Sequence, residues 1–243
     1  DPDISKASTL PSSFYRSEHV FKDIKEKVFL KSWQFIGDEE LVKLPKSAHP
    51  FVLLEGYLTE PLLLTKDENG DVYCMSNVCT HRANLVVLGS GKYKKLTCMY
   101  HGRRFDLKGN FEHMPEFQNA KNFPRECDGL HKFNLHQWGA LLFAGLDPAF
   151  DFKEVINIMQ ERIGFLPLHG LRCDASLSKE YLVQAHWALY CDNYLEGFHV
   201  PFVHEDLNKV LDYGSYTTEI YNYCNLQIGY TNDANDTFDL PER

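Results

Sequence analysis

Two short segments of the chain each pair a cysteine with a histidine. Cys79 precedes His81 by two positions, and Cys98 precedes His101 by three, with residues 82–97 between the pairs. Two thiolates and two imidazoles make four metal ligands. Such a set admits either a tetrahedral structural zinc ion or a [2Fe–2S] cluster in which one iron has two cysteines and the other has two histidines.

The order of these ligands favours the cluster. Zinc fingers normally carry both histidines together on a helix after the two cysteines, whereas here each cysteine leads its own histidine. Each segment can then send its cysteine to one iron and its histidine to the other. The alternative is a chance pairing of core cysteines with surface histidines. The remaining cysteines have no such neighbours and are expected to be small buried hydrophobes, namely Cys74, Cys127, Cys173, Cys191 and Cys224.

A second concentration of metal-binding residue types lies at Glu196, His199 and His204. On a predicted helix, Glu196 and His199 are three apart and share a face. His199 and His204 are about 140° apart around a regular helix, so they converge only if the chain bends. Pro201 supplies that break. The two histidines can be two of the three ligands of a 2-His-1-carboxylate iron site, although histidines near a proline are often only structural or surface residues.

The elements that position these residues follow from hydrophobic periodicity. A helix capped by Ser17 is predicted to end near Trp33. From Phe51 to Phe143, short apolar runs separated by turn residues predict a small antiparallel β domain. Beyond it, the pattern predicts an α+β domain with a helix over 153–163, a strand over 177–187, a helix over 188–199 and one or two strands within 215–230. The stretch 231–243 shows no period and is expected to be a disordered tail or an interrupted domain.

Composition limits the partners. The chain has 243 residues and a formal net charge of −9, which repels phosphate backbones and anionic lipid surfaces, so we expect no nucleic acid and no membrane partner. No apolar stretch approaches the roughly 18 residues of a membrane span. Seven cysteines, an odd number, fit a reducing compartment. We therefore expect a cytoplasmic protein, whose chain is trimmed or cut at its start because it begins at Asp1.

The first constellation resembles the Rieske motif, C-x-H followed after 16 residues by C-x-x-H, and the resemblance extends over roughly residues 45–148. Respiratory-chain Rieske proteins carry an extra cysteine in each loop. Here those positions hold Asn84 and Tyr100, so the chain is similar to the lower-potential type of ferredoxins and oxygenases. Met99 replaces the usual proline and Arg103 the frequent tryptophan, and neither change removes a ligand.

The second constellation resembles that of Rieske non-haem iron oxygenase α subunits, in which an acidic residue, a histidine and a second histidine follow an Asn-Tyr pair. It is especially similar to the branch that contains choline monooxygenase. The resemblance implies that His199 and His204 bind a mononuclear non-haem Fe(II). It also implies that Glu196 takes the place of the family's bridging aspartate, joining an iron ligand to His101 of the neighbouring subunit in a head-to-tail homotrimer.

This resemblance implies an α+β fold and an oxidoreductase function. The expected parts are an N-terminal helical arm (1–45), a Rieske [2Fe–2S] domain (46–148) and the start of a helix-grip catalytic domain (149–243). Electrons from NAD(P)H, delivered by a reductase or ferredoxin, would pass through the cluster to the iron. There O₂ would hydroxylate or demethylate a small organic substrate, whether an aromatic ring, a quaternary ammonium compound or another amine.

Two other interpretations stay open. The family's third iron ligand is an aspartate well over a hundred residues beyond the histidines, and the chain ends 39 residues after His204, so no third ligand is assigned. The second interpretation is therefore a Rieske electron carrier with an incomplete second domain. Such a carrier, however, has no use for Glu196, His199 and His204. A zinc-stabilised binding module is the third interpretation.

Overall fold

The computed structural model of the chain describes residue 3 and residues 5–231. The chain divides into two units. We call one the sheet unit (Lys22–Ile156 and Leu166–Ser176) and the other the hairpin unit (Asp1–Phe21, Asn157–Phe165 and Leu177–Arg243). Among the described residues, no helix combines the length and the apolarity needed to cross a membrane.

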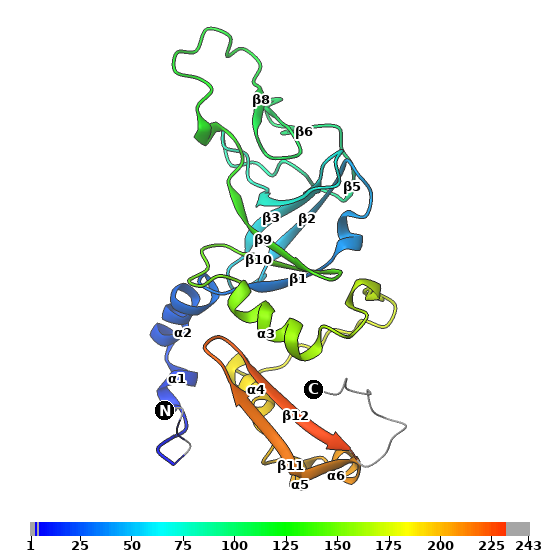
Figure 1. Cartoon of the computed structure of the whole chain (residues 1–243). Helices are drawn as coiled ribbons and strands as arrows, with labels where there is room; N and C mark the ends of the chain where they lie inside the picture. Colours follow the sequence, from blue (N-terminus) through cyan, green and yellow to red (C-terminus); the bar gives the residue numbers. More distant parts are fainter. Residues whose placement is uncertain (1–2, 4, 232–243) are drawn as a thin grey trace. The chain divides into compact units, whose positions relative to one another are not determined.

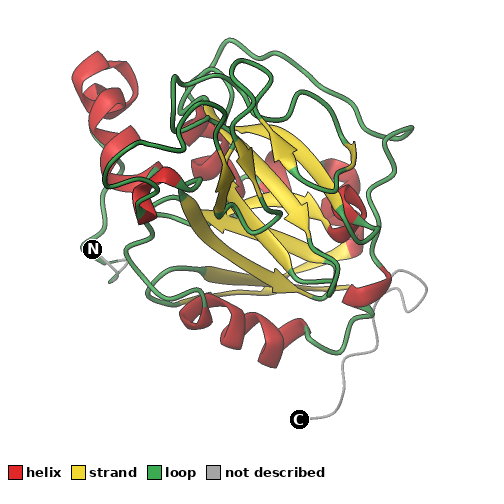
Figure 2. Cartoon of the chain, turned by 90° about the horizontal axis from the view of Figure 1, so that it is seen from above, coloured by secondary structure: helices red, strands yellow, loops and turns green. Residues whose placement is uncertain are grey.

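The sheet unit is built on a seven-stranded antiparallel sheet with the strand order β1-β10-β9-β4-β3-β2-β5 (Figure 1). Its strands are β1 (Gln34–Asp38), β2 (Ser47–Leu53), β3 (Glu60–Lys66), β4 (Val72–Ser76), β5 (Gly91–Lys92), β9 (Lys132–Trp138) and β10 (Leu141–Gly145). A separate three-stranded sheet comprises β6 (Leu96–Thr97), β7 (Arg104–Phe105) and β8 (Phe111–His113). Loops, green in Figure 2, connect these short strands. The predicted antiparallel β domain is confirmed.

Strand β3 explains how this sheet acquires two hydrophobic layers. Successive side chains of a strand point to opposite faces, and all three residues of the run Leu62–Leu64 are fully buried. Leu62 and Leu64 join a cluster with Leu142 on one face, while Leu63 joins a second cluster on the other. This second cluster also contains two of the predicted metal ligands, Cys79 and Cys98. One side of the candidate site is therefore part of the hydrophobic core.

The N-terminal region is helical over a shorter stretch than predicted. It contains α1 (Ser12–Arg16), α2 (Glu18–Ile24) and a π-helical turn, η1 (Lys25–Phe29). The Val20 amide donates to the Ser17 hydroxyl at 3.4 Å, as expected of the cap. The helix nevertheless ends at Phe29 rather than near Trp33, because residues 34–38 pair with β10 and so satisfy their backbone groups in the sheet.

The hairpin unit confirms most of the predicted α+β elements. Helix α3 (Lys153–Ile163) begins in the sheet unit and matches the predicted helix, and strands β11 (Leu211–Ile220) and β12 (Asn225–Thr231) form an antiparallel hairpin. Three further helices precede the hairpin, namely α4 (Trp187–Tyr194), α5 (Val200–Val203) and α6 (Glu205–Val210). Short 3₁₀ turns occur at η2 (Glu39–Val42), η3 (Glu126–Asp128) and η4 (Leu168–Gly170).

One predicted element of this region is wrong, and a second is shorter than predicted. The strand over 177–187 is absent, because no strand of the described chain pairs with this segment, and its apolar side chains, such as Leu182, are exposed. The helix over 188–199 ends early, at Tyr194. The prediction for 231–243 falls outside the described residues, apart from Thr231, which ends β12.

Candidate metal centres

The two cysteine–histidine loops of the sheet unit share one backbone design. In each loop the cysteine amide donates to the carbonyl five residues later, at 2.8 Å for both Cys79 and Cys98. Each cysteine carbonyl accepts from the amide four residues later, at 3.0 Å in the first loop and 2.9 Å in the second. That fourth residue has a positive φ in both loops, 54° at Ala83 and 71° at Gly102. Each loop is therefore closed by its own backbone.

This design separates the thiols from the imidazoles. Cys79 and Cys98 are 3% and 2% exposed and belong to the same core cluster. His81 is half-buried and His101 is exposed, and their ring centroids are 4.8 Å apart. All four predicted ligands of the first constellation are therefore brought together, with the thiols on the core side.

Burial sets the electrostatics of this group. It raises the pKa of the Cys79 thiol, and the neighbouring Cys98 raises this pKa further. Burial also lowers the pKa of His81, and the nearby charges of His101, Arg82 and Arg103 act in the same direction. A lowered pKa keeps the imidazole neutral, which is the form that binds metals.

The donor set fits a binuclear cluster. Two free thiols and two imidazoles provide two ligands for each of two irons, the arrangement of a Rieske centre. Within residue 3 and residues 5–231, no three His, Cys, Asp or Glu side chains form a group that could hold a single metal ion.

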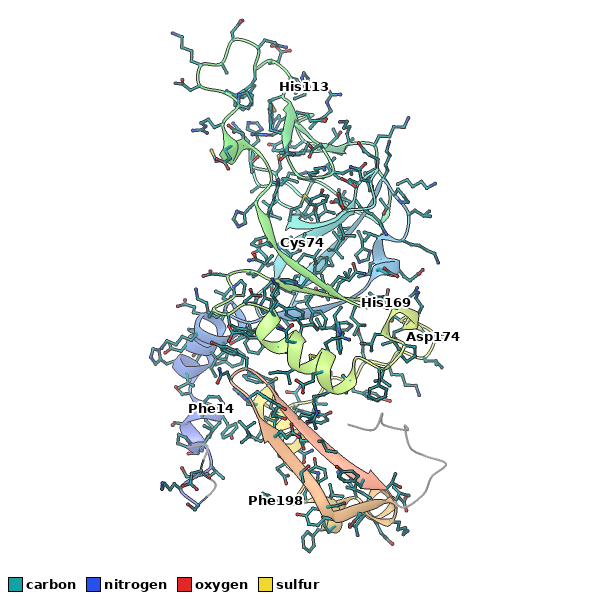
Figure 3. The ribbon with its side chains drawn as sticks, viewed as in Figure 1. Phe14, Cys74, His113, His169, Asp174 and Phe198 are labelled. Carbon is teal, nitrogen blue, oxygen red and sulfur yellow. The ribbon has the colours of Figure 1, made fainter. Side chains whose placement is uncertain are left out.

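The other cysteines are only partly as predicted. Cys74, which lies among the strands in Figure 3, is buried, and burial raises its pKa to about 12. Cys224 is half-buried. The expectation of burial is wrong for the remaining three, because Cys127, Cys173 and Cys191 are exposed.

In the hairpin unit, Glu196 and His199 lie in a turn and not on the predicted helix. In a continuous helix the Phe198 amide would donate to the Tyr194 carbonyl. Here the Phe198 amide donates instead to a Glu196 carboxylate oxygen, and the Tyr194 carbonyl accepts from Gln227 Nε2 at 2.8 Å. Phe198 itself is 68% exposed (Figure 3), so only its backbone takes part. The sequence did not reveal this, because the glutamine lies on a strand 33 residues away.

The turn still joins the carboxylate to the first histidine. Glu196 Oε1 lies 2.5 Å from Nδ1 of His199, which leaves Nε2 as the ring nitrogen that could bind a metal. Burial raises the Glu196 pKa, but hydrogen bonds from His199 and the Phe198 amide outweigh it, and the net shift is downward. The carboxylate is therefore ionised at neutral pH.

The two histidines converge across the short helix α5. His199 precedes this helix and His204 follows it, and Pro201 occupies its first turn as expected. The ring centroids are 5.0 Å apart with an interplanar angle of 72°. The predicted convergence at a break is thus observed, with the helix interrupted before Pro201 rather than at it.

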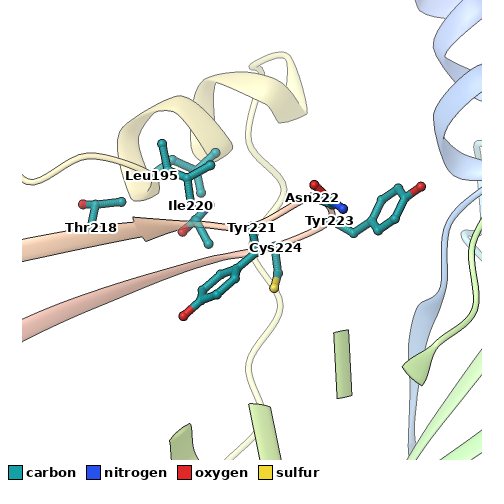
Figure 4. A pocket seen from close by; sticks show the side chains of 8 residues that line it. Leu195, Thr218, Ile220, Tyr221, Asn222, Tyr223 and Cys224 are labelled. Atoms are coloured by element: carbon teal, nitrogen blue, oxygen red, sulfur yellow. The ribbon is translucent and has the colours of Figure 1, made fainter. Parts of the chain in front are cut away.

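A hollow of about 470 Å³ contains all three residues of the second constellation. Its lining includes Glu196, His199, His204, Tyr194, Tyr216 and Leu207. Sequence reasoning missed Tyr216, whose ring packs so closely on Gly197 that an added Cβ there would lie 2.9 Å from it. A second hollow of about 420 Å³ at the β11–β12 turn holds none of the predicted ligands (Figure 4).

Comparison with known proteins identifies the domain that carries the first constellation and the proteins that the whole chain resembles. The family model of the Rieske [2Fe-2S] domain matches residues 32–124, a range that includes all four predicted ligands of the first constellation. Choline monooxygenase of Beta vulgaris is 29% identical over 98% of this chain and 54% of its own length. The carnitine monooxygenase oxygenase subunit of Escherichia coli K12 is 26% identical over 98% of this chain and 63% of its own. The chain is therefore similar to the α subunits of Rieske non-haem iron oxygenases over nearly its whole length.

Solved structures agree with this family in fold. The quaternary ammonium Rieske monooxygenase CntA has a TM-score of 0.74 at 22% identity, over 93% of this chain and 62% of that one. Naphthalene 1,2-dioxygenase from Rhodococcus has a TM-score of 0.62 at 21% identity, over 85% of this chain and 48% of that one. The chain thus spans about half to two thirds of the length of the relatives it matches, and the predicted α+β fold class is confirmed.

Proposed function

We propose that this Rieske oxygenase α subunit takes electrons from a separate reductase or ferredoxin, supplied by NAD(P)H, and uses O₂ to hydroxylate or demethylate a small organic substrate. The observation that carries the proposal is the presence in one chain of two self-closed Cys/His loops and a hollow lined by Glu196, His199 and His204. An electron carrier has no use for the second set.

Cys79, His81, Cys98 and His101 would hold the [2Fe–2S] cluster. A bound Rieske cluster supplies one-electron transfer at a potential set by its ligands and surroundings. The protein's own part is to keep two thiols in the core and two imidazoles toward solvent, and the burial pattern supports this role. His101, which is exposed, is the ligand through which electrons would leave.

His199 and His204 would hold the mononuclear iron. A non-haem Fe(II) held by a facial triad supplies open coordination positions for O₂. Glu196 fixes the ring and tautomer of His199 through Nδ1, as carboxylates near metal-bound histidines do. We further propose that Glu196 accepts a hydrogen bond from His101 of an adjoining subunit in a homotrimer. No third iron ligand is assigned.

A quaternary ammonium compound is our first choice of substrate. Two similar proteins are named for choline and carnitine, and a third is a quaternary ammonium monooxygenase. The hollow also suits a cation, because Tyr194 and Tyr216 present aromatic rings and Glu196 a carboxylate. An aromatic substrate or another amine is the alternative. The domain limits 46–148 and 149–243 and the cytoplasmic location stay predictions.

Metal analysis tests the cluster. We expect two irons and two inorganic sulfides per chain for the cluster, and the visible absorption of a Rieske centre. Cys79→Ser or Cys98→Ser should remove the cluster, whereas Cys127→Ser and Cys173→Ser, at exposed thiols, serve as matched controls and should retain it. Stoichiometric zinc without sulfide would instead support the binding module.

Oxygen consumption tests the oxygenase. Substrate-dependent O₂ uptake with a reductase should accompany product formation and should disappear in His199→Ala. A cluster that is reduced and reoxidised normally, with no O₂ uptake tied to any substrate, would favour the electron carrier.

A further inference from the structure

A third segment, residues 125–129, lies against both ligand loops of the sheet unit. Arg103, from the second loop, donates through Nη2 to the Asp128 carbonyl at 2.8 Å and to its carboxylate at 2.7 Å. The same carbonyl accepts from the Thr80 hydroxyl at 2.8 Å. Thr80 lies between the cysteine and the histidine of the first loop. One peptide group therefore connects both loops.

The Arg103–Asp128 part of this connection is enclosed in the protein. The side chains of Arg103 and Asp128 are only 3% and 8% exposed. Three aromatic rings surround the guanidinium, with centroids 5.1–5.8 Å from its central carbon, namely Phe105, Phe111 and Phe123. Asp128 also accepts from the Arg125 amide at 2.8 Å. Separating a buried ion pair leaves an uncompensated buried charge, which is strongly destabilising. This cost keeps Arg103 and Asp128 together.

Arg103 also closes the second loop through its backbone. Its carbonyl accepts the Cys98 amide at 2.8 Å, while its side chain is anchored on Asp128. A shift of this residue would therefore move the loop that carries Cys98. Its burial means that the departure from tryptophan at this position lies inside the domain rather than on a docking surface.

We propose that Arg103, Asp128 and Thr80 are positioning residues that hold the two ligand loops at a fixed separation. The idea rests on the proposed cluster site, since it gives these loops their purpose. It accounts for a buried charge pair next to the site, where an apolar pair of the same volume would cost less to bury. The separation of the loops in turn sets where the four ligands lie.

Amide hydrogen exchange measures the loops directly. The four amides that close them, those of Cys79, Ala83, Cys98 and Gly102, report local opening in the full chain as purified. In Asp128→Asn, which keeps the size of the side chain, we expect all four to exchange at least about tenfold faster than in the wild-type chain. The electron paramagnetic resonance spectrum of the reduced cluster should shift as well, because the ligands move.

Asp67→Asn is the matched control. Asp67 is also buried, pairs with Lys108 at 3.1 Å in the same unit, and accepts the amides of Asn69 and Asp71 in its own turn. This variant should accelerate exchange only at that turn. Equal acceleration of the loop amides in both variants would reduce Asp128 to a general contributor to stability.

Thr80→Val tests the first loop without the second. It removes the hydroxyl that donates to the Asp128 carbonyl, and it does so at an exposed position. It should speed exchange at Cys79 and Ala83, while Cys98 and Gly102 keep their wild-type rates. Wild-type exchange at the first pair here, or at all four amides in Asp128→Asn, would overturn the proposal. Iron and sulfide analysis of the same wild-type sample tests the proposed cluster separately. The exchange rates report the opening of the loops whether or not a cluster is bound.

Discussion

At the scale of single residues, Glu196 is satisfied twice within its own turn. One carboxylate oxygen holds His199 and the other accepts the Phe198 amide. The Glu196–His199 contact was expected from the spacing, whereas the Phe198 amide bond depends on a turn that the sequence did not reveal. A residue that both orients a ligand and shapes the backbone should be sensitive to loss of charge.

We therefore predict that Glu196→Gln, which keeps the size of the side chain, retains both metals but lowers substrate oxidation about 100-fold. Product formed per reduced cluster in a single turnover measures this. Glu205→Gln is the control, since the Glu205 side chain is 87% exposed and also lies near a predicted ligand in the sequence. A Glu196→Gln chain with the rate of the control would make Glu196 an ordinary surface acid.

Asp128 gives a pH dependence with a definite sign. Burial raises its pKa, but the bonds from Arg103 and Arg125 outweigh burial and the net pKa is lowered. A lowered pKa stabilises the fold above the unfolded value of about 3.9, and this contribution is lost as the pH falls through the folded value.

The prediction is that Asp128→Asn lowers the free energy of unfolding by about 3 kcal/mol at pH 7, as expected when a buried pair loses one charge. The difference from the wild-type chain should begin to shrink below about pH 4, where the carboxylate of the unfolded chain is protonated, and should shrink further as the pH falls through the lowered pKa of the folded state. Urea unfolding at pH 7, 5, 4 and 3 measures it. A difference that grows toward low pH would contradict the assignment.

At the scale of elements, the turn after α4 depends on a glycine. A Cβ at Gly197 would lie 2.9 Å from the Tyr216 ring, whereas a Cβ at Gly170 would meet nothing within 4 Å. We predict that Gly197→Ala destabilises the protein by about 1–3 kcal/mol through overpacking and weakens iron binding, while Gly170→Ala stays within about 0.5 kcal/mol. Unfolding and iron content measured on both variants decide it; equal effects would mean that Tyr216 moves aside freely.

The sequence was informative where local signals decide the element. Apolar runs such as Leu62–Leu64 marked strands, and the ligand spacings marked both constellations. It failed where distant partners decide: β1 exists because β10 pairs with it, and α4 stops where Gln227 takes a carbonyl from the helix. The Arg103–Asp128 pair was invisible for the same reason, since its members are 25 residues apart.

At the scale of the whole molecule, the proposed homotrimer makes each active centre a product of two chains. If electrons pass between neighbouring subunits, a chain without a cluster and a chain without iron can complement each other. Head-to-tail symmetry supplies one such junction per interface.

We predict that Cys98→Ser and His199→Ala, each inactive alone, regain about a quarter of the wild-type activity when their subunits are mixed at random in equal amounts, because one interface in four then has the productive order. Activity after co-refolding or co-expression measures it, with the double variant Cys98→Ser/His199→Ala as the negative control. A mixture that stays inactive would place electron transfer within one chain.

The two ligand loops are each closed by their own backbone hydrogen bonds, without using the ligand side chains. Their shape and their coordination chemistry are therefore separable variables. Exchanging His81 and His101 for cysteine should leave the loop backbone intact while converting a mixed nitrogen–sulfur site into an all-thiolate one, with a correspondingly lower reduction potential. One loop backbone could then hold iron–sulfur clusters that differ in their ligands and in their reduction potentials.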